Sequence, residues 1–305
     1  MEAASARLAE VVFVLGATGT GKSKLAIELS TRFSGEVINS DKIQVYQGMD
    51  VVTNKVTAEE ESLVRHHLLN VVDDPDADFT ADDFRHEVVR AVESIISQGK
   101  VPIIAGGSNS YIEALVDEDF RRKYQTCFFW LDVELTVLHT SVSRRVDRMV
   151  EGGLVEEVRT AFHPEGDYSR GIRRAIGVPE MDRYFRAEAH LEPAARAILL
   201  AEAIDEIKAN TCKLTCSQRG KILKFRDHLR WAIHRLDATE VFLSNGAEAE
   251  EAWEALVLRP AEGIARRFLT HDRQPNAVGP VSMAEEAIIT SAVPLVVGAL
   301  GSPVE

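Results

Sequence analysis

The sequence predicts an α/β protein: a parallel sheet that contains a phosphate-binding loop and is flanked by helices, with a smaller, mostly helical insertion domain. Three observations support this class. Short apolar runs rich in β-branched residues recur over the first 135 residues, they alternate with segments of helical periodicity, and a glycine-rich loop follows the first run. Continuous apolar runs are typical of strands buried on both faces, and strand–helix alternation is typical of parallel sheets.

The first predicted elements form a βαβ unit. Residues 11–15 are a strand candidate that ends in Gly16, residues 23–33 have helical spacing, and residues 36–39 are a second strand candidate. A short apolar run bounded by a glycine fits a buried strand. The glycine-rich loop therefore joins a strand to a helix.

Further elements continue the alternation. Residues 80–98 are expected to form a helix, with apolar residues on one side and a capping box made by Thr80 and Asp83. Residues 101–105 and 127–131 are two more buried strand candidates. Together with the βαβ unit, they complete the predicted core of the sheet.

The second half of the chain reads as mainly helical. Residues 136–162 have a helical pattern, and an apolar stripe at spacings of three and four predicts one long helix that runs on to Leu236. Thr211 and Gln218 interrupt this stripe, either as core hydrogen-bonding groups or as places where the helix passes a ligand. We expect a core over residues 8–135, a substrate-covering region over 136–200, a basic helix and return to the core over 201–270, and a disordered tail over 271–305.

Charge restricts the partners of this protein. The 305 residues contain 35 Lys and Arg against 48 Asp and Glu, a net charge of −13. That balance argues against DNA, RNA or anionic lipid as a main partner. Residues 208–230 differ, because seven Lys and Arg stand against one acid there, 7 − 1 = +6, which leaves −13 − 6 = −19 for the rest. This basic segment either faces polyphosphate or is a solvated helix face.

Other features are less informative. Three cysteines are too few for a disulfide framework and indicate a reducing compartment. Cys212 and Cys216 lack the companions of a zinc site, so we read them as ordinary helix residues. The apolar residues 287–300 are too short and too interrupted to span a bilayer.

Residues 16–23 match the P-loop pattern G-x-x-x-x-G-K-[ST] in full. Glycines let successive backbone N–H groups turn inward, and the following helix adds its positive end. Lys22 supplies a cation, and the Ser23 hydroxyl suits Mg²⁺. The strand before the loop and the helix after it favour a phosphate site over a plain glycine-rich turn.

A carboxylate is expected beside this loop. Asp41 follows the second strand, and ligands of such sheets bind beyond the carboxyl ends of the strands. Asp41 could bind magnesium through water or accept a proton from a nucleophile. The alternative is that residues 39–41 form a turn that Asp41 caps.

Several longer motifs follow one another along the chain, at residues 16–23, 39–50, 53–55, 66–69, 105–115, 174–180 and 207–214. In content and order they resemble one family, the isopentenyltransferases that prenylate N6 of adenine. This family includes tRNA dimethylallyltransferases and the adenylate isopentenyltransferases of plant cytokinin synthesis. The sequence of residues 40–44 and 106–111 is similar to that of the plant adenylate branch. His66 and His67 are interpreted as structural, and Ser217 stands where the family usually has Arg.

The resemblance implies roles for individual residues. Asp41, Thr18 and Lys22 would be catalytic, with Asp41 taking the proton of the adenine amine. The diphosphate of dimethylallyl diphosphate would lie on Gly16, Ala17, Gly19, Thr20, Gly21, Lys22, Ser23 and Arg219, with Mg²⁺ on Ser23. The nucleotide would contact Ser40, Asp41, Lys42, Gln44, Asn54, Lys55, Ser108, Asn109, Lys208, Asn210, Thr211, Lys213 and Gln218.

The expected substrates are dimethylallyl diphosphate and ADP or ATP, with AMP as a further acceptor. The acidic remainder of the chain and the lack of a Cys/His pattern after Cys216 disfavour tRNA. A tRNA dimethylallyltransferase, a P-loop kinase of a small metabolite and a nucleotide-sensing binding module are the alternatives. We expect no DNA, membrane or obligate protein partner. The expected location is the plastid if a transit peptide has been removed, and the cytoplasm otherwise.

Overall fold

A six-stranded parallel sheet lies at the centre of this protein. The computed structural model describes residues 8–270. The strand order is β3-β2-β4-β1-β5-β6, and every paired neighbour is parallel. The strands are β1 (Ala9–Gly16), β2 (Gly35–Asn39), β3 (His66–His67), β4 (Val101–Ala105), β5 (Tyr124–Asp132) and β6 (Ile233–Asp237). This confirms the predicted fold class.

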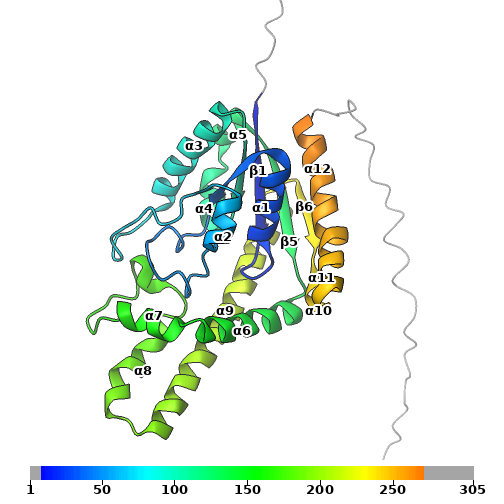
Figure 1. Cartoon of the computed structure of the whole chain (residues 1–305). Coiled ribbons are helices and arrows are strands. Elements are labelled where there is room, and N and C mark those ends of the chain that lie inside the picture. The colour runs from blue at the N-terminus through cyan, green and yellow to red at the C-terminus, as the bar shows by residue number, and fades with distance from the viewer. Residues whose placement is uncertain (1–7, 271–305) are drawn as a thin grey trace, which may run out of the picture. The chain divides into compact units, whose positions relative to one another are not determined.

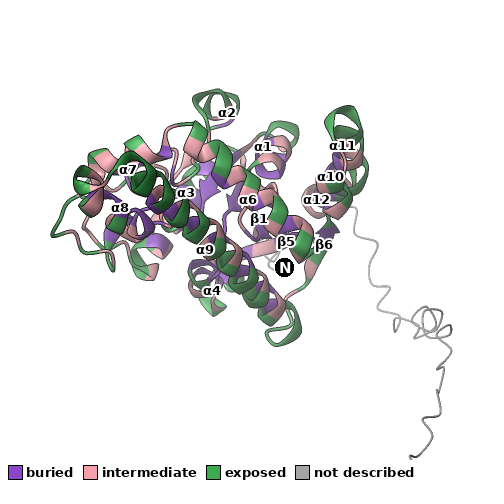
Figure 2. Ribbon diagram, turned by 90° about the horizontal axis from the view of Figure 1, so that it is seen from below, coloured by how far each residue is buried: buried purple, intermediate pink, exposed green. Residues whose placement is uncertain are grey.

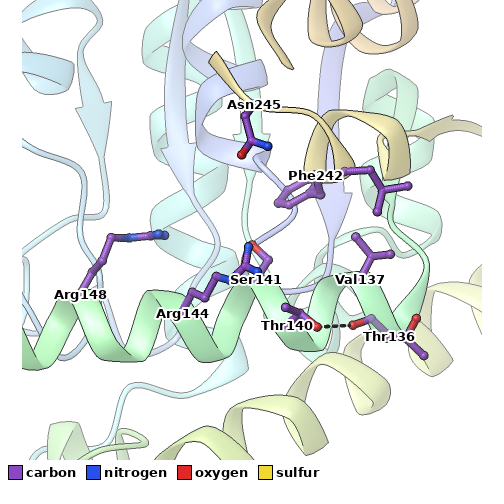
Figure 3. A pocket seen from close by; sticks show the side chains of 9 residues that line it. Thr136, Val137, Thr140, Ser141, Arg144, Arg148, Phe242 and Asn245 are labelled. Atoms are coloured by element: carbon purple, nitrogen blue, oxygen red, sulfur yellow. Dashed lines mark hydrogen bonds between the residues drawn. The ribbon is translucent and has the colours of Figure 1, made fainter. Parts of the chain in front are cut away.

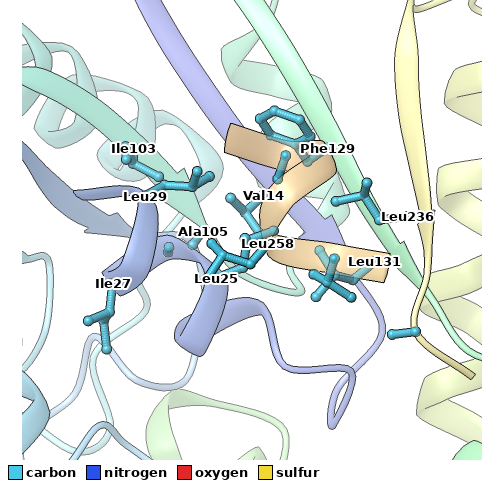
Figure 4. Close-up of a cluster of buried hydrophobic side chains, with 14 of the residues drawn as sticks. Val14, Leu25, Ile27, Leu29, Ile103, Ala105, Phe129, Leu131, Leu236 and Leu258 are labelled. Carbon is cyan, nitrogen blue, oxygen red and sulfur yellow. The ribbon is translucent and has the colours of Figure 1, made fainter. Parts of the chain in front are cut away.

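Helices cover both faces of the sheet (Figure 1). Because side chains alternate along a strand, Val12 and Val14 of β1 face one layer, and Phe13 and Leu15 face the other. The first layer contains α1 (Lys22–Phe33), α6 (Leu135–Glu151) and α12 (Arg259–Thr270), and Figure 4 shows its centre. The second contains α3 (Ala81–Ser97), α4 (Asn109–Leu115), α5 (Glu118–Lys123) and the end of α9 (Pro193–Asp227).

A third apolar cluster lies beyond the carboxyl ends of the strands. It joins residues of the 45–52 loop to α7 (Leu154–Ala161), α8 (Asp182–Ala187) and the first half of α9. Figure 2, seen from below, shows α9 and α6 crossing this edge of the sheet. The remaining elements are α2 (Ala58–Leu63), α10 (Thr239–Leu243), α11 (Gly246–Trp253), the 3₁₀ turns η1 (Gly171–Arg174), η2 (Pro179–Met181) and η3 (Glu188–His190), and the π-helical turn η4 (Glu254–Leu258).

The predicted start of α3 is confirmed, whereas the helix predicted over 136–162 is divided. Thr80 and Asp83 form the predicted capping box at the start of α3. Two glycines divide the predicted helix over 136–162 into α6 and α7, because Gly153 has a φ of 99°, which a helix interior does not accept. The expected boundaries at residues 135 and 200 remain predictions, since α9 contributes to two of the three apolar clusters.

The prediction of one helix through Leu236 is wrong. Helix α9 ends at Asp227, Arg230 adopts a left-handed φ of 55°, and the Trp231 ring stacks on Phe225 at 4.5 Å. The chain then pairs with β5 as strand β6. Ile233 and Leu236 continue the helical spacing, but pairing with β5 satisfies their backbone groups, and a periodic pattern does not report that contact.

Two expectations concern the rest of the chain. The predicted disordered tail, residues 271–305, lies outside the described residues, as does the apolar stretch 287–300. Within residues 8–270, none of the helices combines the length and the apolar character needed to cross a bilayer.

Candidate active site

The phosphate loop connects β1 to α1 in the conformation that the motif requires. Gly19 and Gly21 have φ values of 84° and 93°, which residues with a Cβ rarely adopt. A Cβ on Gly16 would come 2.9 Å from the Leu131 carbonyl oxygen. Gly21 is the N-cap of α1 and provides no side-chain cap, so the first N–H groups of the helix are available to an anion.

Internal contacts hold the polar groups of this loop. The Lys22 ammonium donates to the Ala17 carbonyl at 2.7 Å, and the Thr20 hydroxyl donates to the same oxygen at 2.9 Å. Arg145 donates to the Thr18 hydroxyl at 2.9 Å. Burial lowers the pKa of Lys22 to about 8, although Asp41 acts in the opposite direction. Lys22 is therefore a partly buried cation that an anion would stabilise.

A cavity of about 350 Å³ lies beside the loop. It receives side chains from the 41–54 segment, α6, η1 and α9, which brings together residues far apart in the chain. Its polar lining is Thr18, Asp41, Lys42, Gln44, Thr53, Asn54, Ser108, Arg145, Arg174, Thr211 and Gln218. Its apolar lining is Ile43, Val52, Val146, Met149, Ala175, Ile176, Ile207 and Leu214. The cavity can hold a ligand with an anionic part and an apolar part.

Asp41 is the one carboxylate among the described residues that line this cavity. Its Oδ1 accepts a hydrogen bond from the Ile43 amide at 2.9 Å, while its own amide donates to Asn39 Oδ1 at 3.0 Å. Within the described residues, its Oδ2 accepts no hydrogen bond. The turn interpretation and the functional one are thus compatible, since one oxygen closes the turn and the other stays open to a ligand.

Gln218 links α9 to two loops at the edge of the sheet. Its Oε1 accepts from the Thr18 amide at 2.7 Å, and its Nε2 donates to the Gly107 carbonyl at 3.0 Å. The Asn109 side chain donates to the Gln218 carbonyl at 3.0 Å. A Cβ on Gly107 would lie 2.3 Å from Gln218 Nε2, so only glycine permits this approach. Gln218 therefore fixes the position of the phosphate loop relative to α9.

The structure brings together about half of the predicted nucleotide residues. Lys42, Gln44, Asn54, Ser108 and Thr211 line the cavity, together with Asp41 and Gln218. Thr211 also bonds within its helix, to the Ile207 carbonyl at 2.8 Å. Ser40 and Asn109 are buried behind the rim, with 0% and 1% of their surface exposed.

Lys55 lies apart from this lining. Its ammonium donates to the carbonyls of Tyr46 and Gly48 and to the side chains of Asp50 and Asn70, at 2.6–2.8 Å. Only 4% of its side chain is exposed. In this arrangement Lys55 holds the 46–50 loop, and a contact with the nucleotide stays a prediction.

The predicted cations of α9 also lie away from the cavity. Arg219 forms two hydrogen bonds to Asp132, at 2.8 and 3.1 Å. Lys208 pairs with Asp147 at 2.6 Å, and Lys213 contacts Asn210, which itself donates to Glu180. Their proposed contacts with substrate phosphates stay predictions. Ser217 is exposed on the same helix.

Sequence reasoning missed two arginines of the cavity. Arg145 and Arg174 both line it, and the Nε atom of each is buried without a hydrogen-bond partner among the described residues. Arg145 follows Leu138 and Val142 by seven and three residues, so it lies on the buried stripe of α6. Arg174 opens one of the motifs that carried the resemblance. A cation within an apolar stripe is the signal that could have found Arg145.

The fold and this site define a P-loop enzyme that transfers a group from a phosphorylated donor. A sequence profile of the IPP transferase family matches residues 44–123 and 117–220. Adenylate isopentenyltransferase 5, chloroplastic, of Arabidopsis thaliana is 54% identical over 295 residues, which cover 95% of this chain and 89% of that protein. The chain therefore belongs to the IPP transferase family, as the motifs predicted.

Two further likenesses are more distant. The tRNA dimethylallyltransferase 2 of Arabidopsis thaliana is 30% identical over 378 residues, with 86% of this chain and 80% of that protein covered. A crystal structure of a eukaryotic dimethylallyltransferase acting on tRNA superposes with a TM-score of 0.73 at 22% identity, covering 88% of this chain and 81% of that one. It shows the fold. The chloroplastic location in the first relative's name agrees with the expected plastid location.

Proposed function

We propose that this protein transfers a dimethylallyl group from dimethylallyl diphosphate to N6 of the adenine of ADP or ATP and releases diphosphate. The observation that carries the proposal is the cavity itself, in which one open carboxylate, Asp41, faces a lining of cationic, neutral polar and apolar side chains. The names of the relatives, adenylate isopentenyltransferase and dimethylallyltransferase, agree with it.

The donor would bind at the phosphate loop. Its diphosphate would replace the Ala17 carbonyl as the partner of Lys22, and the open N–H groups of α1 would bind its oxygens. Arg145 and Arg174 would add the donors that now lack partners. Charge develops on the diphosphate as the bond from oxygen to the prenyl carbon breaks, so these groups stabilise the transition state. The apolar lining would hold the prenyl chain.

The acceptor amine needs help from a base. The N6 lone pair is delocalised into the ring, which makes the amine a weak nucleophile. As N6 forms its bond to the prenyl carbon, it loses a proton, and Asp41 would accept that proton on its open oxygen. Gln218 would keep the phosphate loop in place during this step.

A magnesium ion fits the donor side. The Ser23 hydroxyl is exposed and makes no hydrogen bond within the described residues, so it would hold Mg²⁺ together with diphosphate oxygens and water. Between residues 8 and 270, no group of three or more His, Cys, Asp and Glu could hold a metal by itself, which suits an ion bound through its substrate. The ion would neutralise charge on the diphosphate.

A free nucleotide is the favoured acceptor. The relative named adenylate isopentenyltransferase is 54% identical, whereas the one named for tRNA is 30% identical. The net charge of −13 also opposes an extended RNA surface.

Incubation with dimethylallyl diphosphate and AMP, ADP, ATP or unmodified tRNA tests the proposal, with products identified by mass. We expect prenylated ADP and ATP. Asp41→Asn should lower kcat by about 10²–10⁴-fold while the protein still binds the donor. Product on tRNA alone would overturn the choice of acceptor. ADP released from ATP without a prenyl donor would instead indicate a kinase, and no turnover at all would indicate a binding module.

A further inference from the structure

A second pocket lies between α6 and α10, outside the cavity described above. Its volume is about 440 Å³, and none of residues 16–23 lines it. Figure 3 shows Ser141, Arg144 and Arg148 on α6, with Phe242 and Asn245 across from them. The lining residues of this α6–α10 pocket are Thr136, Val137, Thr140, Ser141, Arg144, Arg148, Phe242, Leu243 and Asn245.

The two arginines of this pocket have no acidic partner. Neither Arg144 nor Arg148 forms an ion pair or a side-chain hydrogen bond within residues 8–270, and no acid is among the lining residues. They are four residues apart on one helix, and like charges at this spacing destabilise a helix. Because both arginines line one pocket and no acid neutralises them there, an anionic ligand would relieve their repulsion.

Neutral groups complete the lining. The Ser141 hydroxyl and the Asn245 amide make no side-chain hydrogen bond within the described part of the chain, so both can serve a ligand. On the other side, Phe242, Val137 and Leu243 present apolar surface, and Leu243 is 59% exposed. Two guanidinium groups with a hydroxyl and an amide offer more donors than a carboxylate can accept, whereas a phosphate group can use them.

We propose that the α6–α10 pocket is a second phosphate-recognition site, which binds the phosphate or diphosphate group of a small organic phosphate through Arg144, Arg148, Ser141 and Asn245. The apolar side would take the organic part. Both an allylic diphosphate and an adenine nucleotide have this chemistry, and the two are separated by experiment. The site does not depend on the proposed reaction, because its lining is distinct from the phosphate loop and from Asp41.

The pocket adjoins the active site through α6. Arg148 also lines a hollow of about 310 Å³ with Asp50, Lys55, Arg145 and Met149, and it forms no ion pair with Asp50. Burial lowers the pKa of Arg145, and the charge of Arg148 adds to this effect. An anion bound to Arg148 would reduce that repulsion, so occupancy of the second site should strengthen donor binding at the first.

Binding stoichiometry tests the proposal directly. Calorimetry with inorganic pyrophosphate, dimethylallyl diphosphate, ADP and AMP should show two sites on the unaltered protein. In Arg144→Gln/Arg148→Gln, we expect one site to be lost or weakened by at least about tenfold. Arg90→Gln/Arg122→Gln removes the same charge from exposed helix positions and should retain both sites.

A second variant isolates the pocket. Lys22→Met weakens the phosphate loop, so the binding that remains should report the second site and disappear when the arginine pair is also replaced. Protection of residues 239–245 from hydrogen exchange by pyrophosphate should disappear with it. One site in the unaltered protein, or equal binding by the two double variants, would overturn the proposal. The probe that binds most tightly identifies the source of the phosphate.

Discussion

The cations of α6 and those of α9 differ in whether acidic side chains pair with them. The segment 208–230 carries +6, yet four of its seven cations pair with an acid, as in Lys208–Asp147, Arg219–Asp132 and Lys224–Glu113. Helix α6 has only 3 − 2 = +1, from Arg144, Arg145 and Arg148 against two acids. No acid pairs with any of these three within residues 8–270. Arg145 reaches the cavity, and the other two line the second pocket.

This difference shows that the net charge of a segment does not locate an anion site. Coulomb attraction to a ligand is available only where a cation is not already neutralised at close range. Sequence counts add charges along the chain, whereas pairing depends on the elements packed against them. The unpaired cation is therefore the better indicator, and the comparison can be tested one side chain at a time.

The largest expected effect belongs to α6. Arg145→Gln should lower kcat/KM for the proposed reaction by about 10²–10³-fold, because it removes a charged donor beside the phosphate loop. The matched change on α9 is Lys224→Gln, whose side chain is half exposed and paired with Glu113. It should leave kcat/KM within about twofold. Equal losses in steady-state kinetics would remove the distinction between the two helices.

The next largest effect is expected at Gln218. Helix α9 contributes this neutral amide to the cavity, whereas its predicted cations lie away from it. Gln218→Ala removes the acceptor of the Thr18 amide and should raise KM for the prenyl donor about tenfold. Gly107→Ala should act in the same direction, since its Cβ would displace Gln218 Nε2. Ser217→Ala, at the exposed neighbour, serves as the control. An unchanged KM in both variants would mean that Gln218 does not position the loop.

The charge of Lys22 gives a smaller, pH-dependent effect. Its pKa is lowered to about 8 by burial, so the cation that binds diphosphate is lost as pH rises through that value. Donor affinity measured by calorimetry should fall about threefold or more between neutral pH and one unit above this pKa. Lys22→Arg keeps its charge in this range, so its affinity should not decline there.

The lowered pKa of Lys22 also makes the free energy of unfolding depend on pH. The unfolded chain keeps the Lys22 proton up to the ordinary value of 10.5, whereas the folded chain releases it near 8. Because the unfolded state binds more protons in this window, the contribution of Lys22 to the free energy of unfolding rises with pH there. A fall in this contribution, measured against Lys22→Met, would contradict the burial of the ammonium.

The smallest effect on activity is expected at Arg219. Arg219→Gln removes one partner of Asp132, a carboxylate with 2% of its side chain exposed, but Arg235 still pairs with it. We expect kcat/KM to change by less than about twofold and the free energy of unfolding to fall by about 1–2 kcal/mol. Arg122→Gln, from an exposed pair, should change neither. A large loss of activity in Arg219→Gln would restore this residue as a diphosphate ligand.

Local sequence predicted the backbone part of the site. The phosphate loop and Asp41 follow strands β1 and β2, and parallel strands deliver both to one edge of the sheet. Thr211 and Gln218 were identifiable because they interrupt an apolar stripe, and both line the cavity. Each of these patterns lies within a continuous stretch of chain, so it can be recognised without knowledge of the fold.

Contacts between distant segments were not predictable in this way. Arg145 reaches Thr18 across 127 positions of sequence, and its neighbours along α6 do not reveal that contact. Strand β6 exists because β5 offers an unpaired edge, although its residues continue a helical spacing. The partners of Lys208 and Arg219 likewise come from α6 and β5. In each case the deciding group is supplied by another element.

Lys55 has a consequence for the wall of the cavity. Its ammonium is surrounded by four oxygens, three from residues 46–50 and one from Asn70, in the manner of a bound potassium or sodium ion. This loop thus has its counter-ion attached by covalent bonds, so its shape should not depend on which monovalent salt is present. The same arrangement shields Lys55 from reagents that acylate lysine, because only 4% of its side chain is exposed and its ammonium is held by these oxygens.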